Sequence, residues 1–266
     1  MADTGSPEVS KNEMFNYDRY AEVLNAHVNV DGLVDYVALQ AERGELDAFV
    51  AALGNVSQDE MSAWDRSARF AFWINAYNAT TLKRIVDHYP IKKGGLIAGF
   101  RYPENSIRQI PGVWDTLNSK VAGRDVTLDA IEHEVLRPEF KDPRVHAALV
   151  CASIGCPPLR SEPFIADRLN EQLDDQMRKF LSRADAFRID HAKSKVYLSS
   201  IFDWFADDFS ESYKTDSGFP GQAPPRRAVL SFVSKYVSDA DAQFLRGNSY
   251  DVVYMDYDWT LNEQPK

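Results

Sequence analysis

One helical segment constrains the fold of this chain more than any other feature. Phe70 to Ala79 reads Phe-Ala-Phe-Trp-Ile-Asn-Ala-Tyr-Asn-Ala, which is apolar almost all round a helix. The segment lies in the middle of a helical pattern that runs from Ala63 to Tyr89, and Pro90 ends that pattern. A helix without a polar face is buried on most of its sides. We therefore expect a central core helix, with Asp59 or Ser62 as its N-cap.

The rest of the 266 residues mixes helical patterns with short β-strand signals. We expect helices at Tyr17–Leu24, Val37–Leu53, Leu128–Arg137, Ile165–Leu181 and Arg226–Leu245, and strands at Arg144–Cys151, Lys195–Ser199 and Tyr250–Met255. The Asp31-Gly32 pair predicts a tight turn between β-branched residues. No internal repeat or shift in composition marks a second domain. The pattern predicts an α+β fold with several helices around a modest sheet, in which residues 1–13 form a flexible tail and 14–266 a single domain.

Composition narrows the classes of partner. Asp and Glu total 40 against 30 Lys and Arg, which gives a formal net charge of −10, and no Lys/Arg-rich block occurs. This balance argues against a nucleic-acid or anionic-membrane binder. No run of about 18 apolar residues predicts a membrane span. The polar N-terminus has no signal-peptide pattern, which favours a soluble cytoplasmic protein, or a secreted or periplasmic one if a leader was trimmed.

The two cysteines, Cys151 and Cys156, are too few for a disulfide framework. Cys151 closes the predicted strand 144–151 and opens a loop of small residues, a place where reactive side chains are often presented. The alternative is a thiol that simply packs in the core. Cys156 lies in a Gly-Cys-Pro-Pro turn and is equally compatible with a nucleophile, a resolving thiol or a structural residue. His146, Cys151 and Cys156 do not have the spacing of a standard zinc site, and a fourth ligand is missing. We therefore expect neither a metal ion nor a cofactor.

A nucleophilic cysteine needs a base, and the helix predicted at 128–137 offers candidates. Glu132 falls inside the apolar stripe of that helix, where an unpartnered carboxylate is costly, and His133 lies at its margin. Asp129 precedes His133 by one turn and is placed to fix the imidazole tautomer. The alternative is an ordinary amphipathic helix with a polar flank. His146, in an otherwise apolar run, is more typical of a core residue.

Asn75 and Asn78 lie within the most apolar helix of the chain. Buried amides need hydrogen-bond partners. They either brace the backbone of a neighbouring loop or donate to a bound oxyanion, and bracing is the more common role.

Several motifs occur together along the chain: Asp31-Gly-Leu-Val-Asp-Tyr36, Phe72-Trp-Ile-Asn-Ala-Tyr-Asn-Ala79, Ile131-Glu-His133, Arg144-Val-His-Ala-Ala-Leu-Val-Cys151 with Gly155-Cys-Pro-Pro-Leu-Arg160, Ile201-Phe-Asp-Trp-Phe205, and Tyr257-Asp-Trp259. Through these motifs taken together, the chain resembles the family catalogued as domain of unknown function 547. The resemblance implies a papain-like or transglutaminase-like α+β fold. It also implies Cys151 as nucleophile, His133 as base and Glu132 as the residue that orients it.

These inferences predict a cysteine-dependent acyl-transfer enzyme, a hydrolase or transferase acting on an amide or a thiol-containing peptide. Cys151 attacks a carbonyl, His133 moves the proton, and Asn75, Asn78 and Cys156 contact the substrate. Two alternatives stay open. One is a non-catalytic module that binds a small molecule or peptide, such as a glutathione-like ligand. The other is a redox protein that cycles Cys151 and Cys156. The sequence does not specify an oligomeric state.

Overall fold

The computed structural model describes residues 15–265, so the predicted tail at residues 1–13 lies outside the described part. The fold is a mixture of helices and small sheets, which confirms the α+β prediction. The helices are α1 (Asp18–His27), α2 (Tyr36–Ala41), α3 (Gly44–Asn55), α4 (Gln58–Ala63), α5 (Arg66–His88), α6 (Leu96–Arg101), η1 (Ile107–Gln109), η2 (Ala130–Phe140), α7 (Val145–Ala148), η3 (Ala166–Arg168), α8 (Leu169–Leu181), α9 (Ile201–Trp204), α10 (Ala206–Tyr213), α11 (Pro224–Val233) and α12 (Asp239–Gly247). The strands are β1 (Ser119–Val121), β2 (Arg124–Val126), β3 (Phe187–Asp190), β4 (Lys195–Ser199) and β5 (Asp251–Met255).

Helix α5 is the predicted central helix, and its residues from Phe70 to Leu82 are buried. It begins later than expected. The side chain of Asp65 caps it by accepting a hydrogen bond from the Ala68 amide, whereas Ser57 caps the separate short helix α4. Neither Asp59 nor Ser62 is therefore the cap of the central helix. The break falls at Trp64 and Asp65, whose extended backbone cannot continue a helix.

The main sheet has three strands in the order β3-β4-β5. Strands β3 and β4 are antiparallel, whereas β4 and β5 run parallel with Leu198 opposite Tyr254. The strands predicted at Lys195–Ser199 and Tyr250–Met255 are confirmed, the second within one residue. Strands β1 and β2 form a separate two-stranded hairpin. Two predicted long helices, 37–53 and 226–245, are each divided into two, α2 with α3 and α11 with α12.

The strand predicted at Arg144–Cys151 is wrong, because its first half is the one-turn helix α7. Asp142 accepts a hydrogen bond from the Arg144 amide and pairs with the Arg144 guanidinium, which favours a turn at this point. The two alanines that follow are good helix formers. The chain becomes extended from Leu149, so Cys151 follows the C-terminus of a short helix.

The helix expected at 128–137 forms as η2, which has π-helical hydrogen bonding over Ala130–Phe140. Thr127 opens it, since its hydroxyl accepts a hydrogen bond from the Ala130 amide at 3.1 Å. A π-helix is wider than an α-helix and is frequently found at functional sites. The α-helical spacing between Asp129 and His133 therefore does not apply here.

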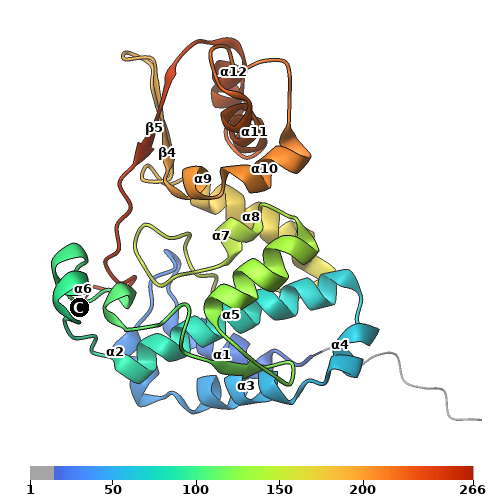
Figure 1. Ribbon diagram of the computed structural model, residues 1–266, viewed down its shortest axis with the longest axis vertical. Coiled ribbons are helices and arrows are strands. Elements are labelled where there is room, and N and C mark those ends of the chain that lie inside the picture. Colours follow the sequence, from blue (N-terminus) through green and yellow to red (C-terminus); the bar gives the residue numbers. More distant parts are fainter. Residues whose placement is uncertain (1–14, 266) are drawn as a thin grey trace, which may run out of the picture.

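Two hydrophobic clusters fill the molecule. The larger one surrounds α5 and includes α1 and α3, whereas the smaller one joins the main sheet to α10, α11 and α12. Figure 1 shows α5 crossing the larger part, with β4, β5, α11 and α12 at the opposite end. Helix α8 belongs to both clusters, since Leu173 packs into the first and Met177 into the second.

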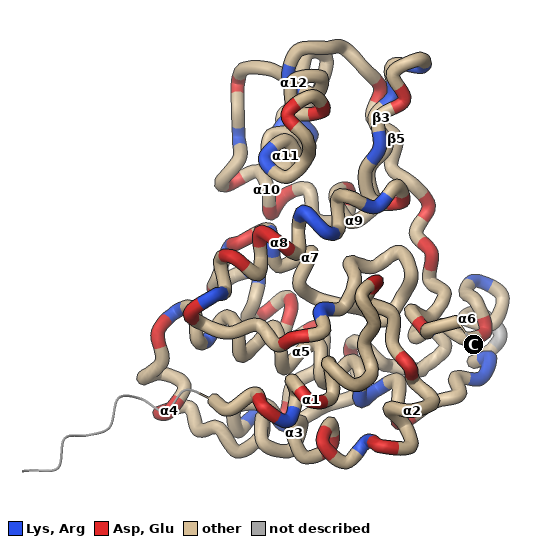
Figure 2. Tube along the Cα trace, turned by 180° about the vertical axis from the view of Figure 1, so that it is seen from behind, with Lys and Arg blue, Asp and Glu red and all other residues tan. Residues whose placement is uncertain are grey.

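Figure 2 shows Lys and Arg interspersed with Asp and Glu, both around α3 and α5 and around α11 and α12. Within residues 15–265, no helix is long and apolar enough to span a membrane.

The segment after β5 returns to the larger part and joins distant pieces of chain. Its carbonyls at Asn262 and Thr260 accept hydrogen bonds from the amides of Val34 and Ile154, at 2.9 and 2.8 Å. The turn predicted near Asp31-Gly32 forms, with Gly32 at a φ of 79°. A side chain at Gly32 would place its Cβ 2.5 Å from that of Pro158, so glycine is needed for this close approach.

Candidate active site

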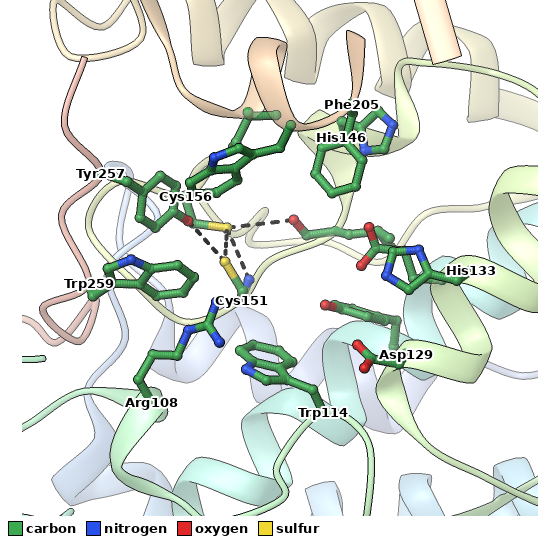
Figure 3. Close-up of a pocket in the computed structure, with 15 residues that line it drawn as sticks. Arg108, Trp114, Asp129, His133, His146, Cys151, Cys156, Phe205, Tyr257 and Trp259 are labelled. Carbon is green, nitrogen blue, oxygen red and sulfur yellow. Dashed lines mark hydrogen bonds between the residues drawn. The ribbon is translucent and has the colours of Figure 1, made fainter. Parts of the chain in front are cut away.

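A pocket of about 260 Å³ lies where η1, η2, α9, the segment after α7 and the C-terminal segment meet. Its walls are largely aromatic, with side chains from Trp114, Trp204, Phe205, Tyr257 and Trp259. Figure 3 shows the two cysteines and Tyr257 on one side of the pocket, and Asp129 and His133 on the other. The volume is slightly below the usual lower limit for small-ligand pockets, about 300 Å³, so it suits a small ligand.

The backbone around Cys151 is held in a sharp turn. The residue after it, Ala152, has a φ of 52°, which is uncommon for a residue with a side chain. On the other side, the amide of Asn78 donates to the Ala148 carbonyl at 2.8 Å and accepts from the Val150 amide at 2.9 Å. Backbone conformations of this kind are concentrated at functional sites.

The two cysteines form a tightly coupled pair of unlike thiols. Their sulfur atoms lie 3.0 Å apart, and the Cys151 amide donates to Cys156 Sγ at 3.0 Å. The neutral Cys151 thiol donates a hydrogen bond to Cys156 Sγ. Burial raises the pKa of Cys156 well above its usual value, so Cys156 keeps its proton and becomes the hydrogen-bond donor once Cys151 is a thiolate. That hydrogen bond is the main reason why the pKa of Cys151 falls to about 7, although burial acts in the opposite direction.

Two hydroxyl groups add to the stabilisation of a Cys151 thiolate. The Tyr257 hydroxyl lies 3.0 Å from Cys151 Sγ and 2.9 Å from Ser153 Oγ. Burial raises the pKa of Tyr257 well above 10, so the phenol stays protonated and donates to the sulfur. Local reasoning on the sequence missed the role of Tyr257, because this residue is 106 residues away from Cys151 along the chain. Its occurrence in a Tyr-Asp-Trp motif was the one available signal.

Glu132 is the carboxyl group whose charge state is linked to Cys151. Burial raises the pKa of Glu132 to about 7, and the negative charge of Cys151 adds to this effect. The charge of Arg137 and a hydrogen bond with Tyr77 oppose it. At neutral pH the site therefore holds one thiol and one carboxyl group that titrate in the same range.

His133 lines the pocket but takes part in a different network. Arg137 Nη1 donates to His133 Nδ1 at 2.9 Å, and the same guanidinium binds both oxygens of Asp208 at 2.7 and 2.8 Å. Partial desolvation and the charge of Arg137 lower the pKa of His133. The neutral imidazole therefore carries its proton on Nε2, and Nδ1 is occupied as an acceptor.

His146 is buried, as its apolar surroundings in the sequence suggest. Its Nε2 donates to Asp208 at 2.7 Å, and its ring stacks on Phe205 with 4.0 Å between centroids. Burial lowers the pKa of His146, so the ring is neutral. Among residues 15–265, neither this histidine nor His133 forms a hydrogen bond with Cys151.

The amide of Asn75 is fully engaged away from the pocket. It donates to the Phe164 carbonyl at 2.7 Å and accepts from the Phe164 amide at 3.0 Å. Asn78 holds the backbone on both sides of Leu149 in the same manner. Both asparagines are in the bracing arrangement, and neither lines the pocket. In the described part of the chain, no group of three or more His, Cys, Asp or Glu side chains is arranged to hold a metal ion.

Comparison with known protein families finds a match for part of the chain. A family model described as "Protein of unknown function, DUF547" matches residues 61–181. This segment, somewhat less than half of the chain, is similar to that family. It confirms the resemblance inferred from the sequence, and it contains both cysteines, Glu132 and His133. The motifs at 31–36, 201–205 and 257–259 lie outside the matched segment. No curated protein and no solved structure matches the chain. The papain-like fold stays a prediction.

Proposed function

We propose that this protein is a cysteine-dependent acyl-transfer enzyme, with Cys151 as the nucleophile and Glu132 as the general acid and base. The observation that carries the proposal is the pairing of a thiol and a carboxyl group, both with a pKa of about 7, in one pocket. A catalytic acid–base group works best when its pKa lies near the working pH. A thiolate is the nucleophilic form of cysteine.

In the first half-reaction, the Cys151 thiolate attacks the carbonyl carbon of an amide or thioester. A carbon–sulfur bond forms, and the carbonyl π electrons move to the oxygen. When the tetrahedral intermediate collapses, the bond to the leaving amine or thiol breaks, and protonated Glu132 gives that group its proton. The products are a Cys151 thioester, the free leaving group and a Glu132 carboxylate.

In the second half-reaction, the Glu132 carboxylate removes a proton from water or from an acceptor amine or thiol. The acceptor attacks the thioester carbonyl, and Cys151 leaves as a thiolate. Glu132 is protonated again, so the site returns to its starting state with no net change in protons or electrons.

The proposal changes two roles suggested by the sequence. Glu132 replaces His133 as the base, because His133 Nδ1 accepts a hydrogen bond from Arg137 and its Nε2 carries the proton. His133 contributes a hydrogen-bond donor to the pocket wall. Asn75 does not stabilise an oxyanion, because both ends of its amide hold Phe164. Cys156 is a positioning residue that lowers the pKa of Cys151.

Reaction with p-nitrophenyl acetate tests this function. We expect a rapid burst of p-nitrophenolate, an acetyl group on Cys151 detected by peptide mass analysis, and slower turnover. Cys151→Ala should abolish the burst, and Glu132→Gln should slow the turnover that follows it. Exposed Glu134→Gln is the matched control and should change neither phase.

Two results would overturn the proposal. If Cys151 gains no acetyl group and reacts with iodoacetamide as an ordinary thiol with a pKa of about 8.5, the pocket is a binding site. If no acetyl group forms and a mild oxidant links Cys151 to Cys156, the redox alternative applies. The two sulfur atoms lie 3.0 Å apart, so they need to move only a little to form this disulfide.

A further inference from the structure

Arg108 brings a positive charge into the pocket among aromatic rings. Its guanidinium carbon lies 4.2 Å from the ring centroid of Trp259, 5.4 Å from that of Tyr102 and 5.8 Å from that of Trp114. Figure 3 shows the guanidinium pointing into the pocket, on the side where Cys151 lies and between Trp114 and Trp259. Rings that face a cation fix its position without neutralising its charge.

The turn that carries Arg108 is firmly anchored. Arg108 is the middle residue of η1, whose other two residues, Ile107 and Gln109, are buried. The Gln109 side chain accepts from the Gly94 amide at 2.7 Å and donates to the Pro103 carbonyl at 2.9 Å, and it also binds two further backbone carbonyls. A residue on such a support is positioned before a ligand arrives, which reduces the entropy lost on binding.

Arg108 also has no anionic partner within the described residues. No carboxylate of residues 15–265 forms an ion pair with it, and its buried Nε has no hydrogen-bond partner. Arg137 provides the contrast, since Asp208 binds it through two hydrogen bonds. A partly buried guanidinium that lacks a counter-ion carries unused hydrogen-bonding capacity.

We propose that Arg108 binds a carboxylate of the substrate, so that the acyl-transfer reaction acts on a small carboxylate-bearing amide or thioester. The inference rests on the proposed function for its reaction, but its binding step stands separately. A planar guanidinium matches the two oxygens of a carboxylate. The indole rings of Trp114 and Trp259 flank this group and offer flat apolar contact to the adjoining part of the substrate.

The charge distribution in the pocket gives the substrate one orientation. Among the described side chains that line the pocket, Arg108 is the one basic side chain of the Lys or Arg type. Asp129 lies on the opposite side of the pocket, near His133. A carboxylate is attracted to Arg108 and repelled by Asp129. The rest of the substrate then points toward the side of the pocket that η2 forms, and η2 carries Glu132.

Two alkylating reagents of nearly equal size test the anion site without a known substrate. Iodoacetate carries a carboxylate, and iodoacetamide carries a neutral amide in its place. The ratio of their rate constants at Cys151 measures attraction for the carboxylate. We expect this ratio to fall about tenfold in Arg108→Gln, and by less in Arg108→Lys, which keeps a charge but loses the planar fork.

Lys92→Gln is the matched control, since it removes an exposed positive charge shortly before α6 from a residue that does not line the pocket, and should leave the ratio unchanged. An unchanged ratio in folded Arg108→Gln, or an equal fall in Lys92→Gln, would overturn the inference. Propionate should slow alkylation by iodoacetamide in the natural chain and not in Arg108→Gln. Protection by inorganic phosphate alone would contradict the carboxylate assignment.

The result also separates this inference from the proposed function. If the rate ratio depends on Arg108 but Cys151 is never acetylated, the carboxylate site is supported and the enzymatic function is rejected. If Cys151 is acetylated but the rate ratio does not depend on Arg108, the enzymatic function is supported and the carboxylate site is rejected.

Discussion

Cys151 and Cys156 have different chemistry although their sulfur atoms lie only 3.0 Å apart. The Cys151 thiolate receives hydrogen bonds from Cys156 and Tyr257, whereas Cys156 is buried deeply enough to keep its proton. A thiolate stabilised by hydrogen bonds, with no neighbouring imidazolium, keeps its nucleophilic form near neutral pH. The difference between the two residues therefore comes from what each one touches.

Replacing Cys156 by Ala should raise the pKa of Cys151. The variant loses the S–H donor that contributes most to the lowered pKa. We expect the midpoint of the pH–rate profile for iodoacetamide to move from about 7 toward about 8.5, with an approximately tenfold slower reaction at pH 7. Tyr257→Phe removes the weaker donor and should shift the midpoint less. A larger shift in Tyr257→Phe than in Cys156→Ala would contradict this ranking.

Glu132→Gln should change the pH dependence of folding stability. The folded-state pKa of Glu132, about 7, lies above its ordinary value of 4.5. The stability that this raised pKa contributes is fully present below pH 4.5 and is lost as the pH rises through 7. We expect Glu132→Gln to gain about 2–3 kcal/mol relative to the natural chain between pH 4 and pH 8. Urea unfolding at several pH values measures the difference in unfolding free energy between the variant and the natural chain. Glu134→Gln, at an exposed position, should show no change of this difference with pH.

At the scale of elements, α5 positions the cysteine segment through its asparagines rather than through its apolar face alone. The apolar run in the sequence predicts a buried helix, and Asn78 interrupts that run to hold the chain around Leu149. Ala148 ends α7, so its carbonyl has no partner within that helix, and Val150 lies outside the helices and strands. The side-chain amide supplies the partners that a sheet would otherwise provide.

Asn78→Ala should therefore destabilise the fold and disturb the thiol together. Two buried backbone groups lose their partners, which costs about 2–4 kcal/mol. Thermal unfolding measures the loss, and the iodoacetamide profile should show a higher pKa for Cys151. The control is Asn118→Ala, because that side chain is exposed and makes one 3.3 Å hydrogen bond to its own turn. Normal Cys151 reactivity in a destabilised Asn78→Ala would show that the brace acts on stability alone.

The sequence predicts helices and strands correctly where the pattern of apolar residues is strong. The prediction fails where that pattern extends over only a few residues. The apolar run of α5 and the β-branched and aromatic residues of β4 and β5 are visible locally, so the sequence predicts these elements. The apolar run 144–151 suits a strand and a buried helix equally, and length did not separate them. The π-helical form of η2 depends on packing that no local pattern records. Cys151, Glu132 and His133 do line one pocket, but Arg108 and Tyr257 approach them through tertiary contacts.

At the scale of the whole molecule, the pocket is completed by a C-terminal segment that is far away in sequence. That segment follows β5, runs past the cysteine loop, and pairs with the N-terminal turn through Val34. It supplies Tyr257 and Trp259 to the pocket. The chemical state of Cys151 thus depends on how closely the C-terminal segment approaches the loop 151–158.

Gly155 sets that approach. Its amide donates to the Asp258 carbonyl at 2.9 Å, and a Cβ added at Gly155 would lie 2.8 Å from the Asp258 amide nitrogen. Since backbone cannot yield as a flexible side chain does, Gly155→Ala should push the C-terminal segment outward and lengthen the contact between Tyr257 and Cys151. We expect a raised Cys151 pKa in the iodoacetamide profile, together with a loss of stability of about 1–3 kcal/mol.

Gly247→Ala is the matched control, because a Cβ there meets no atom within 4 Å, and it should leave both measurements nearly unchanged. Combining Gly155→Ala with Tyr257→Phe separates contact from general damage. If Gly155 acts through Tyr257, the double variant should have the same Cys151 pKa as Tyr257→Phe alone, because the hydroxyl that Gly155→Ala displaces is already absent. Additive shifts would instead mean that Gly155 influences the thiol through the loop itself, and the C-terminal segment would lose its role in tuning Cys151.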